Sequence, residues 1–176
     1  SLLILAACAA DLPPITDCQP RGNMTPICNM QAPEDIAILP DHQHLLLAHF
    51  GGMEGSAGSV SLFDTANLTR TNLYPNGKNG TPNWGDANCT EPPNTQFGPH
   101  GTHLHQLANG TWRYLVVNHF GREAIEMFEV IGDGADTALT WRGCVFPADD
   151  TLVNDVVGMS NGDLIYTRMY HPSDSL

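Results

Sequence analysis

The stretch HGTHLHQLANGTWRYLVVNH, residues 100–119, has the pattern of two short β-strands joined by a tight turn. Both halves contain β-branched or aromatic residues, and the Asn-Gly pair between them is a strong signal for a β-hairpin. The same order of features occurs in EDIAILPDHQHLLLAH (34–49) and in NDVVGMSNGDLIYTR (154–168). The first six residues of the three stretches align without gaps. The chain therefore repeats a small antiparallel unit.

Further strands follow within the first two units. Apolar alternation and β-branched or aromatic residues predict strands at GSVSLFD (58–64), EAIEMFEV (123–130) and LTWRGCVF (139–146). The units start at residues 34, 100 and 154, and a Gly-, Pro- and Asn-rich stretch at 74–99, which we expect to be a long loop, explains the larger first spacing. Four-stranded antiparallel repeats of this kind are typical of β-propeller blades. We predict an all-β fold, specifically part of a β-propeller, with further blades beyond both ends of the chain.

Residues 1–17 have the composition of a targeting segment and a linker. The apolar run SLLILAACAA ends in small residues, as a secretion signal does. LAAC, from Leu5 to Cys8, resembles a bacterial lipobox, in which the cysteine is lipidated; an ordinary signal cleaved after ACA or CAA is the alternative. We predict an exported protein, either a periplasmic or outer-membrane lipoprotein anchored through Cys8 or a secreted one, with the propeller part over residues 18–176.

Charge and cysteine content limit the possible partners. The chain has 176 residues, a net charge of −12 and only seven Lys and Arg residues, so nucleic acid and anionic membranes are not expected partners. Export permits disulfides among four cysteines, for which the sequence leaves three pairings open: Cys18, Cys28, Cys89 and Cys144. No CxxC spacing indicates zinc, and no GxSxG motif indicates a serine hydrolase.

Polar residues occupy the first positions of the repeat. In a propeller the innermost strand of each blade lines the central channel, so equivalent positions converge. The first aligned position holds Glu34, His100 and Asn154, and the second holds Asp35, Gly101 and Asp155. Two carboxylates 4 Å apart repel by about 1 kcal/mol in water and about 4 kcal/mol at an effective dielectric of 20, and neither position holds a Lys or Arg. A cation that prefers oxygen ligands, Ca²⁺ rather than Zn²⁺, would relieve this repulsion; each acid taken alone would be a solvent-facing residue at a strand end.

The histidines divide into two groups. At the ends of the second strands, the same alignment makes three residues equivalent: His49, His119 and Arg168. On a strand, His103 and His105 share one face and His100 points to the other, so these three do not form one metal cluster. Five histidines are interpreted as structural or solvent-facing: His42, His44, His103, His105 and His171.

Four segments resemble, in order and spacing, the corresponding segments of the serum paraoxonase/arylesterase family: PEDIAILP (33–40), GPHGTHL (98–104), YLVVNH (114–119) and LVNDVVG (152–158). Members of that family are calcium-dependent six-bladed β-propellers that hydrolyse lactones and aryl esters. The resemblance runs from about residue 33 to residue 170. It implies that this chain is the first part of a six-bladed propeller from a bacterial relative.

The resemblance also implies roles for individual residues. Glu34 and Asn154 would ligate a catalytic calcium ion. Asp35 and Asp155, with the main-chain carbonyl of Thr102, would ligate a second, structural calcium ion. His100 would act as general base on a water molecule, with His119 as its partner in a histidine dyad. Calcium can stabilise a developing oxyanion, and a histidine with an ordinary pKa of about 6.5 suits proton removal at neutral pH.

Other functions are compatible with the same residues. The family's remaining calcium ligands lie in later blades, so we expect this stretch of chain alone to be inactive. One alternative is a non-catalytic exported propeller that uses calcium as a structural clip and binds a partner or ligand. Another is a sugar-lactonase or strictosidine-synthase-like propeller. The presence of both His100 and His119 favours the ester or lactone hydrolase, because a structural clip needs neither.

Overall fold

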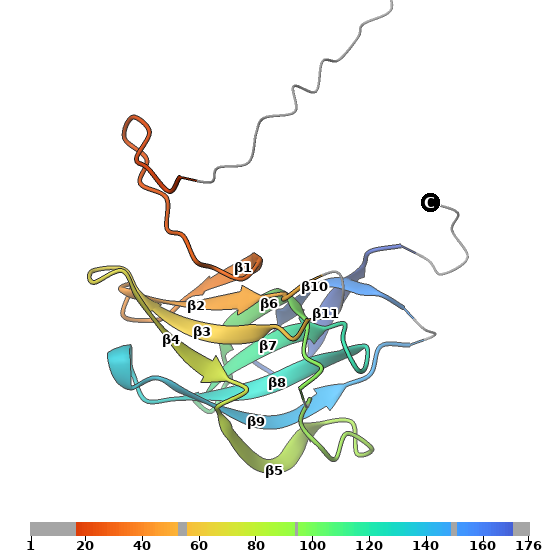
Figure 1. Ribbon diagram of the computed structural model, residues 1–176. Helices are drawn as coiled ribbons and strands as arrows, with labels where there is room; N and C mark the ends of the chain where they lie inside the picture. Colours follow the sequence, from red (N-terminus) through yellow and green to blue (C-terminus); the bar gives the residue numbers. More distant parts are fainter. Residues whose placement is uncertain (1–16, 53–55, 94, 149–150, 171–176) are drawn as a thin grey trace, which may run out of the picture.

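The computed structural model describes residues 17–52, 56–93, 95–148 and 151–170 (Figure 1). The lipobox expected at Leu5–Cys8 and the histidine at position 171 lie outside the described residues. The described part is all-β, with eleven strands and one 3₁₀ turn at Gly134–Asp136. Within these ranges, no helix is long and apolar enough to cross a lipid bilayer.

The strands form three sheets. The first is an antiparallel meander of four neighbouring strands: β1 Pro33–Ile38, β2 His44–His49, β3 Ser59–Asp64 and β4 Thr69–Tyr74. The second is a meander of four strands with a fifth, β5, at its outer edge: β6 Pro99–Gln106, β7 Trp112–Asn118, β8 Ala124–Ile131, β9 Ala138–Val145 and β5 Lys78–Gly85. The third is the hairpin of β10 Val153–Gly158 and β11 Leu164–Arg168.

The stretch at residues 74–99 differs from its prediction as one long loop. Within it, β5 runs parallel to β9, pairing Lys78 with Thr140 and Gly85 with Cys144. Its polar, Gly- and Pro-containing sequence lacks the apolar alternation of a half-buried strand, and most of β5 is exposed. The strand is therefore formed by main-chain pairing to an existing sheet edge, which the side-chain pattern does not report.

Both faces of the second sheet are buried. Alternate residues of β7 point to opposite faces, and Tyr114 and Val116 pack with Leu46 and Leu62 of the first sheet. Leu115 and Val117 belong to a separate core cluster with residues of β10 and β11. The first and third sheets thus cover opposite faces of the second (Figure 1).

The first strand of each repeat unit, namely β1, β6 and β10, carries the same irregularity. The pairing register shifts between Pro33 and Asp35 in β1, between Pro99 and Thr102 in β6, and between Val153 and Asp155 in β10. The residues within these shifts include Glu34, His100 and Asn154. Beyond them the register is shared, since Ile36, Thr102 and Val156 pair with Leu47, Val116 and Tyr166. The ungapped alignment of the three strands is therefore confirmed, and β6 contacts both β1 and β10.

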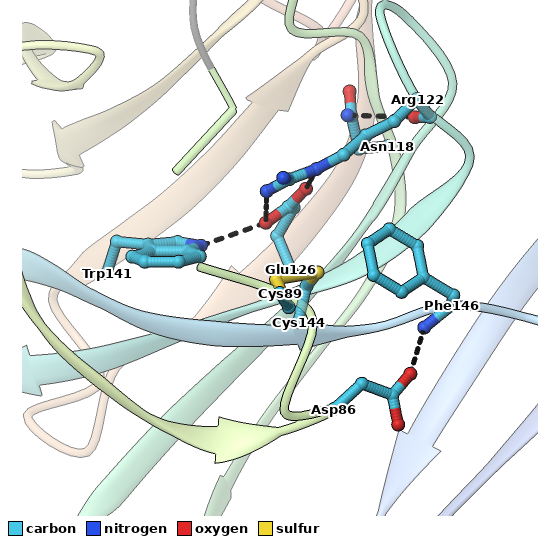
Figure 2. The surroundings of a disulfide bond; sticks show 8 residues. All are labelled: Asp86, Cys89, Asn118, Arg122, Glu126, Trp141, Cys144 and Phe146. Atoms are coloured by element: carbon cyan, nitrogen blue, oxygen red, sulfur yellow. Dashed lines mark hydrogen bonds and ion pairs between the residues drawn. A yellow bond between two sulfur atoms is a disulfide. The ribbon is translucent and has the colours of Figure 1, made fainter. Parts of the chain in front are cut away.

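Two disulfides link the described cysteines. Cys18 pairs with Cys28, and Cys89, after β5, pairs with Cys144 of β9. The second bond lies beside the buried carboxylate of Glu126, which accepts hydrogen bonds from Arg122 and from Trp141 Nε1 (Figure 2). Both disulfides are compatible with an exported protein.

Candidate functional site

A pocket of about 340 Å³ opens where the first strands of the three sheets begin. It is lined by Glu34, Phe50, His100, His119, Leu152, Met169 and Tyr170. Three of the residues singled out from the sequence therefore share one cavity: Glu34, His100 and His119. The remaining walls are mostly apolar side chains, so a ligand here would meet two imidazoles and one carboxylate against a hydrophobic surface.

His100 is held by oxygen atoms from both neighbouring strands. Its Nδ1 lies 2.8 Å from the main-chain oxygen of Asn154, which can only accept, so Nδ1 carries the proton. Its Nε2 lies 3.1 Å from Glu34 Oε1. Both ring nitrogens thus face oxygen acceptors. Asn154 reaches this site through its main chain.

His119 has a different environment. Its Nδ1 lies 2.8 Å from Glu123 Oε2, and a carboxylate there favours the proton on Nδ1. Its Nε2 is buried and has no hydrogen-bond partner among the described residues. The ring meets that of His100 edge-on at 5.1 Å between centroids, and Phe50 contacts both rings. The two histidines are therefore in contact through their rings, and no hydrogen bond joins them in this arrangement.

Three pocket residues occupy equivalent places, one residue beyond the second strand of each sheet. The main-chain N–H groups of Phe50, His119 and Met169 donate to the oxygens of Ala32, Gly98 and Leu152 at 2.9, 3.1 and 2.9 Å. The repeat thus places one side chain from each sheet at an equivalent position in the lining of the pocket.

The expected equivalence of His49, His119 and Arg168 is wrong by one residue for His119. The register pairs His49 with Pro33, Asn118 with Pro99 and Arg168 with Val153. His49 is fully buried, with Nε2 2.7 Å from Ser61 Oγ, and burial lowers its pKa. His49 therefore belongs to the interior of the first sheet. The predicted equivalence failed because the two units were aligned on their shared histidine, which shifted one strand end by a residue.

The residues expected at the structural calcium lie where β1, β6 and β10 meet. Asp35 Oδ2 accepts hydrogen bonds from the main-chain N–H and the hydroxyl of Thr102, at 2.7 and 2.8 Å. On the β10 side, a Cβ at Gly101 would lie 2.7 Å from Asp155 Oδ1 and 2.5 Å from Asn154 O. Only glycine permits this close approach. The structure brings Asp35 and Asp155 to the same segment of β6, apart from the pocket.

The chemical type of the donor atoms at this junction fits calcium. Carboxylate and amide oxygens from three strands are hard ligands of the type that Ca²⁺ takes. Within the part of the chain that the structure describes, only one group of three His, Cys, Asp or Glu side chains has its donor atoms within 4.8 Å, namely Cys89, Glu126 and Cys144. The two sulfurs are bonded to each other, so this group is a disulfide beside a buried ion pair rather than a metal site (Figure 2).

Three of the other histidines, His44, His103 and His105, make structural contacts. His103 Nδ1 accepts from the N–H of Gly158, which links β6 to β10. His105 stacks on His103 at 5.2 Å and accepts from Arg113 Nε. His44 contacts Asp41 Oδ2 at 2.6 Å. The prediction that His103 and His105 share a face is confirmed, and neither lines the pocket.

Four pocket residues escaped sequence reasoning, namely Phe50, Leu152, Met169 and Tyr170, as did Glu123, which contacts His119. Phe50 and Met169 could have been found by counting from the start of each first strand instead of from the shared histidine. Glu123 carried no signal, because a carboxylate four residues after a histidine in a turn is ordinary. A scan of protein-family models and a search of curated proteins each return no match for this chain.

Proposed function

We propose that this protein is a calcium-dependent hydrolase of aryl esters or lactones, built on a β-propeller of the paraoxonase/arylesterase type. The observation that carries the proposal is the single pocket in which a buried histidine nitrogen without a partner, a second imidazole, a carboxylate and an apolar wall meet. These are the groups that ester hydrolysis requires: a base for water, charge for the carbonyl and a surface for the substrate's hydrocarbon.

The propeller part of the proposal is supported by the repeat. Three sheets share one register, stack face to face, and bring their first strands into contact. A blade buries its faces only against its neighbours, and the second sheet has both faces covered in this way. Export, and a lipid anchor through Cys8, belong to the same proposal, and the two disulfides are compatible with export.

Two calcium ions are proposed. Glu34 and Asn154 would hold a catalytic ion, and Asp35, Asp155 and the Thr102 carbonyl a structural one. When bound, the catalytic ion would supply positive charge for the carbonyl oxygen of the substrate. Glu34 supports the catalytic site because its side chain is 44% exposed and contacts a histidine rather than a Lys or Arg. Its carboxylate is therefore accessible to a cation.

His100 and His119 together would activate a water molecule. Phe50 contacts both rings and holds them apart from bulk water on one side. The apolar residues Leu152 and Met169 line the same cavity and would receive an acyl chain or aromatic ring. An uncharged substrate suits this lining, and an anionic one would be repelled by Glu34 unless calcium is bound.

The test uses the complete natural polypeptide and assays phenyl acetate and a small lactone with calcium and with EDTA. We expect turnover that EDTA abolishes and calcium restores. His100→Gln should reduce kcat/KM by at least about 100-fold, the size usual for loss of an acid–base group, and Asn154→Ala should also reduce it by removing a proposed calcium ligand. Turnover that survives EDTA would contradict the proposal, as would full activity in both variants. Calcium binding without any turnover would favour the non-catalytic propeller.

A further inference from the structure

Glu123, next to the pocket residue His119, has a different hydrogen-bond partner at each of its two carboxylate oxygens. Oε2 lies 2.8 Å from His119 Nδ1, and Oε1 accepts from the main-chain N–H of Val153, also at 2.8 Å. Val153 immediately precedes Asn154 on β10. The carboxylate therefore spans from the histidine after β7 to the strand that carries the proposed ligands. Its neighbour Arg122 is engaged elsewhere, in the ion pair with Glu126.

A carboxylate at Nδ1 decides which ring nitrogen of His119 is free. The carboxylate accepts hydrogen bonds and donates none, so the neutral ring carries its hydrogen on Nδ1 and its lone pair on Nε2. That Nε2 is buried and has no hydrogen-bond partner within the described ranges, and the His119 side chain lines the pocket. A buried nitrogen without a partner carries an uncompensated cost of desolvation. A ligand, such as a water molecule donating to Nε2, would recover that cost.

The two histidines are not equivalent in this respect. His100 has an oxygen acceptor at each nitrogen, Asn154 O at 2.8 Å and Glu34 Oε1 at 3.1 Å. His119 has one acceptor, at Nδ1, and an open Nε2. The nitrogen that is free to take a proton in the pocket is therefore on His119, which reverses the assignment expected from the sequence.

We propose that Glu123 is a positioning residue that makes His119 Nε2 the proton acceptor of the histidine pair. This inference rests on the proposed hydrolase function. In the step concerned, an O–H bond of water breaks and its proton moves to His119 Nε2. The oxygen's electron pair forms the new bond to the carbonyl carbon, and the π pair of the carbonyl moves onto its oxygen. That pair then re-forms the carbonyl as the bond between the carbon and the leaving oxygen breaks, and the proton passes from His119 Nε2 to the leaving oxygen.

The experiment measures the tautomer and the kinetics separately. In ¹⁵N-histidine-labelled protein at pH 8, with His119 assigned by the loss of its signals in His119→Gln, wild type should show a protonated Nδ1 and an unprotonated Nε2. Glu123→Gln keeps an oxygen that can accept from Val153 but removes the charge, so the ring should shift toward the Nε2–H tautomer. With calcium present, kcat should fall about 10- to 100-fold, as for other residues that orient a catalytic histidine, while KM changes less than about threefold.

Glu129→Gln is the matched control, since Glu129 is also a partly buried carboxylate on the same hairpin and pairs with Arg142 at the far end of β8. It should change neither the tautomer nor kcat. An Nε2–H tautomer in wild type, or an unchanged tautomer in Glu123→Gln, overturns the assignment. So does an altered tautomer with wild-type kcat. Absence of turnover in wild type refutes the proposed function instead, and the ¹⁵N spectra then still decide whether Glu123 sets the ring.

Discussion

Arg113 Nε donates to His105 Nε2 at 3.1 Å, which makes a neutral histidine the acceptor for a buried guanidinium. The same Arg113 donates to the main-chain oxygens of Gly162 and Asp163 in the turn between β10 and β11. The guanidinium of Arg113 on the second sheet thus links that sheet to the hairpin turn of the third sheet. Burial, together with the charge of Arg113, lowers the pKa of His105 to about 4.

This contact predicts a stability that depends on pH. The unfolded chain binds a proton at position 105 near pH 6.5, and the folded chain near pH 4, so the unfolded state holds more protons between these values. The contribution is complete above pH 6.5 and is lost as the pH falls toward 4. Because the ring is only partly buried, we expect about 1–2 kcal/mol. Urea unfolding of wild type and His105→Gln from pH 4 to 8 measures it.

In His105→Gln, the free energy of unfolding should decline less with falling pH than in wild type. Some decline should remain, since burial also lowers the pKa values of His49 and His103. Identical slopes for wild type and His105→Gln would show that the contact with Arg113 does not control protonation.

The buried ion pair of Arg122 and Glu126 predicts a large and pH-dependent penalty when it is broken. Glu126 is fully buried, and its oxygens lie 2.7 and 2.8 Å from Arg122. Burial raises the pKa of the Glu126 carboxyl, against the lowering effect of Arg122. Arg122→Met should cost about 3–5 kcal/mol at pH 8 and less at pH 5, where the isolated carboxyl is more readily protonated. Chemical unfolding at the two pH values checks this, and Arg122→Met/Glu126→Gln should recover part of the loss.

The two disulfides are expected to differ in their contribution. Cys89 and Cys144 are separated by 55 residues and link the segment after β5 to β9. Replacing both by Ser should lower the free energy of unfolding by about 4 kcal/mol, from the entropy of a loop of this length. Cys18 and Cys28 close a short loop of separation 10 outside the three sheets. Their replacement should cost less, about 2.7 kcal/mol by the same relation, in the same assay; equal losses would contradict this prediction.

Gly101 predicts a steric test of the junction between β6 and β10. A Cβ there would lie 2.5 Å from Asn154 O and 2.7 Å from Asp155 Oδ1. Gly101→Ala should therefore destabilise the protein by about 1–3 kcal/mol and displace the proposed calcium ligands on β10. Thermal unfolding with and without calcium measures both effects. A variant with wild-type stability and calcium response would show that β10 can move away without loss.

Calcium itself should stabilise the folded protein. An ion that binds only the folded state adds about 2.7 kcal/mol at 100 times its Kd. We expect the Tm to rise with calcium and fall with EDTA, and Asp155→Asn to reduce that response. Asp163→Asn, in the exposed turn of the same hairpin, is the control and should retain it. A Tm that is indifferent to calcium would argue against both ions.

The sequence by itself determined the all-β class, the three units and the register of their first strands, because alternation and Asn-Gly turns are local signals. It also singled out Glu34, His100 and His119, which share the pocket. It failed for β5, whose strand depends on pairing with β9, and for His49, which an alignment on a shared residue type displaced by one position. Only the tertiary structure decided that Phe50 and Met169 join His119, and that Glu123 rather than His100 contacts its Nδ1. Phe50, His119 and Met169 come from three separate sheets, and the contact of Glu123 with His119 depends on the path of the turn between β7 and β8; no local spacing or periodicity encodes either arrangement.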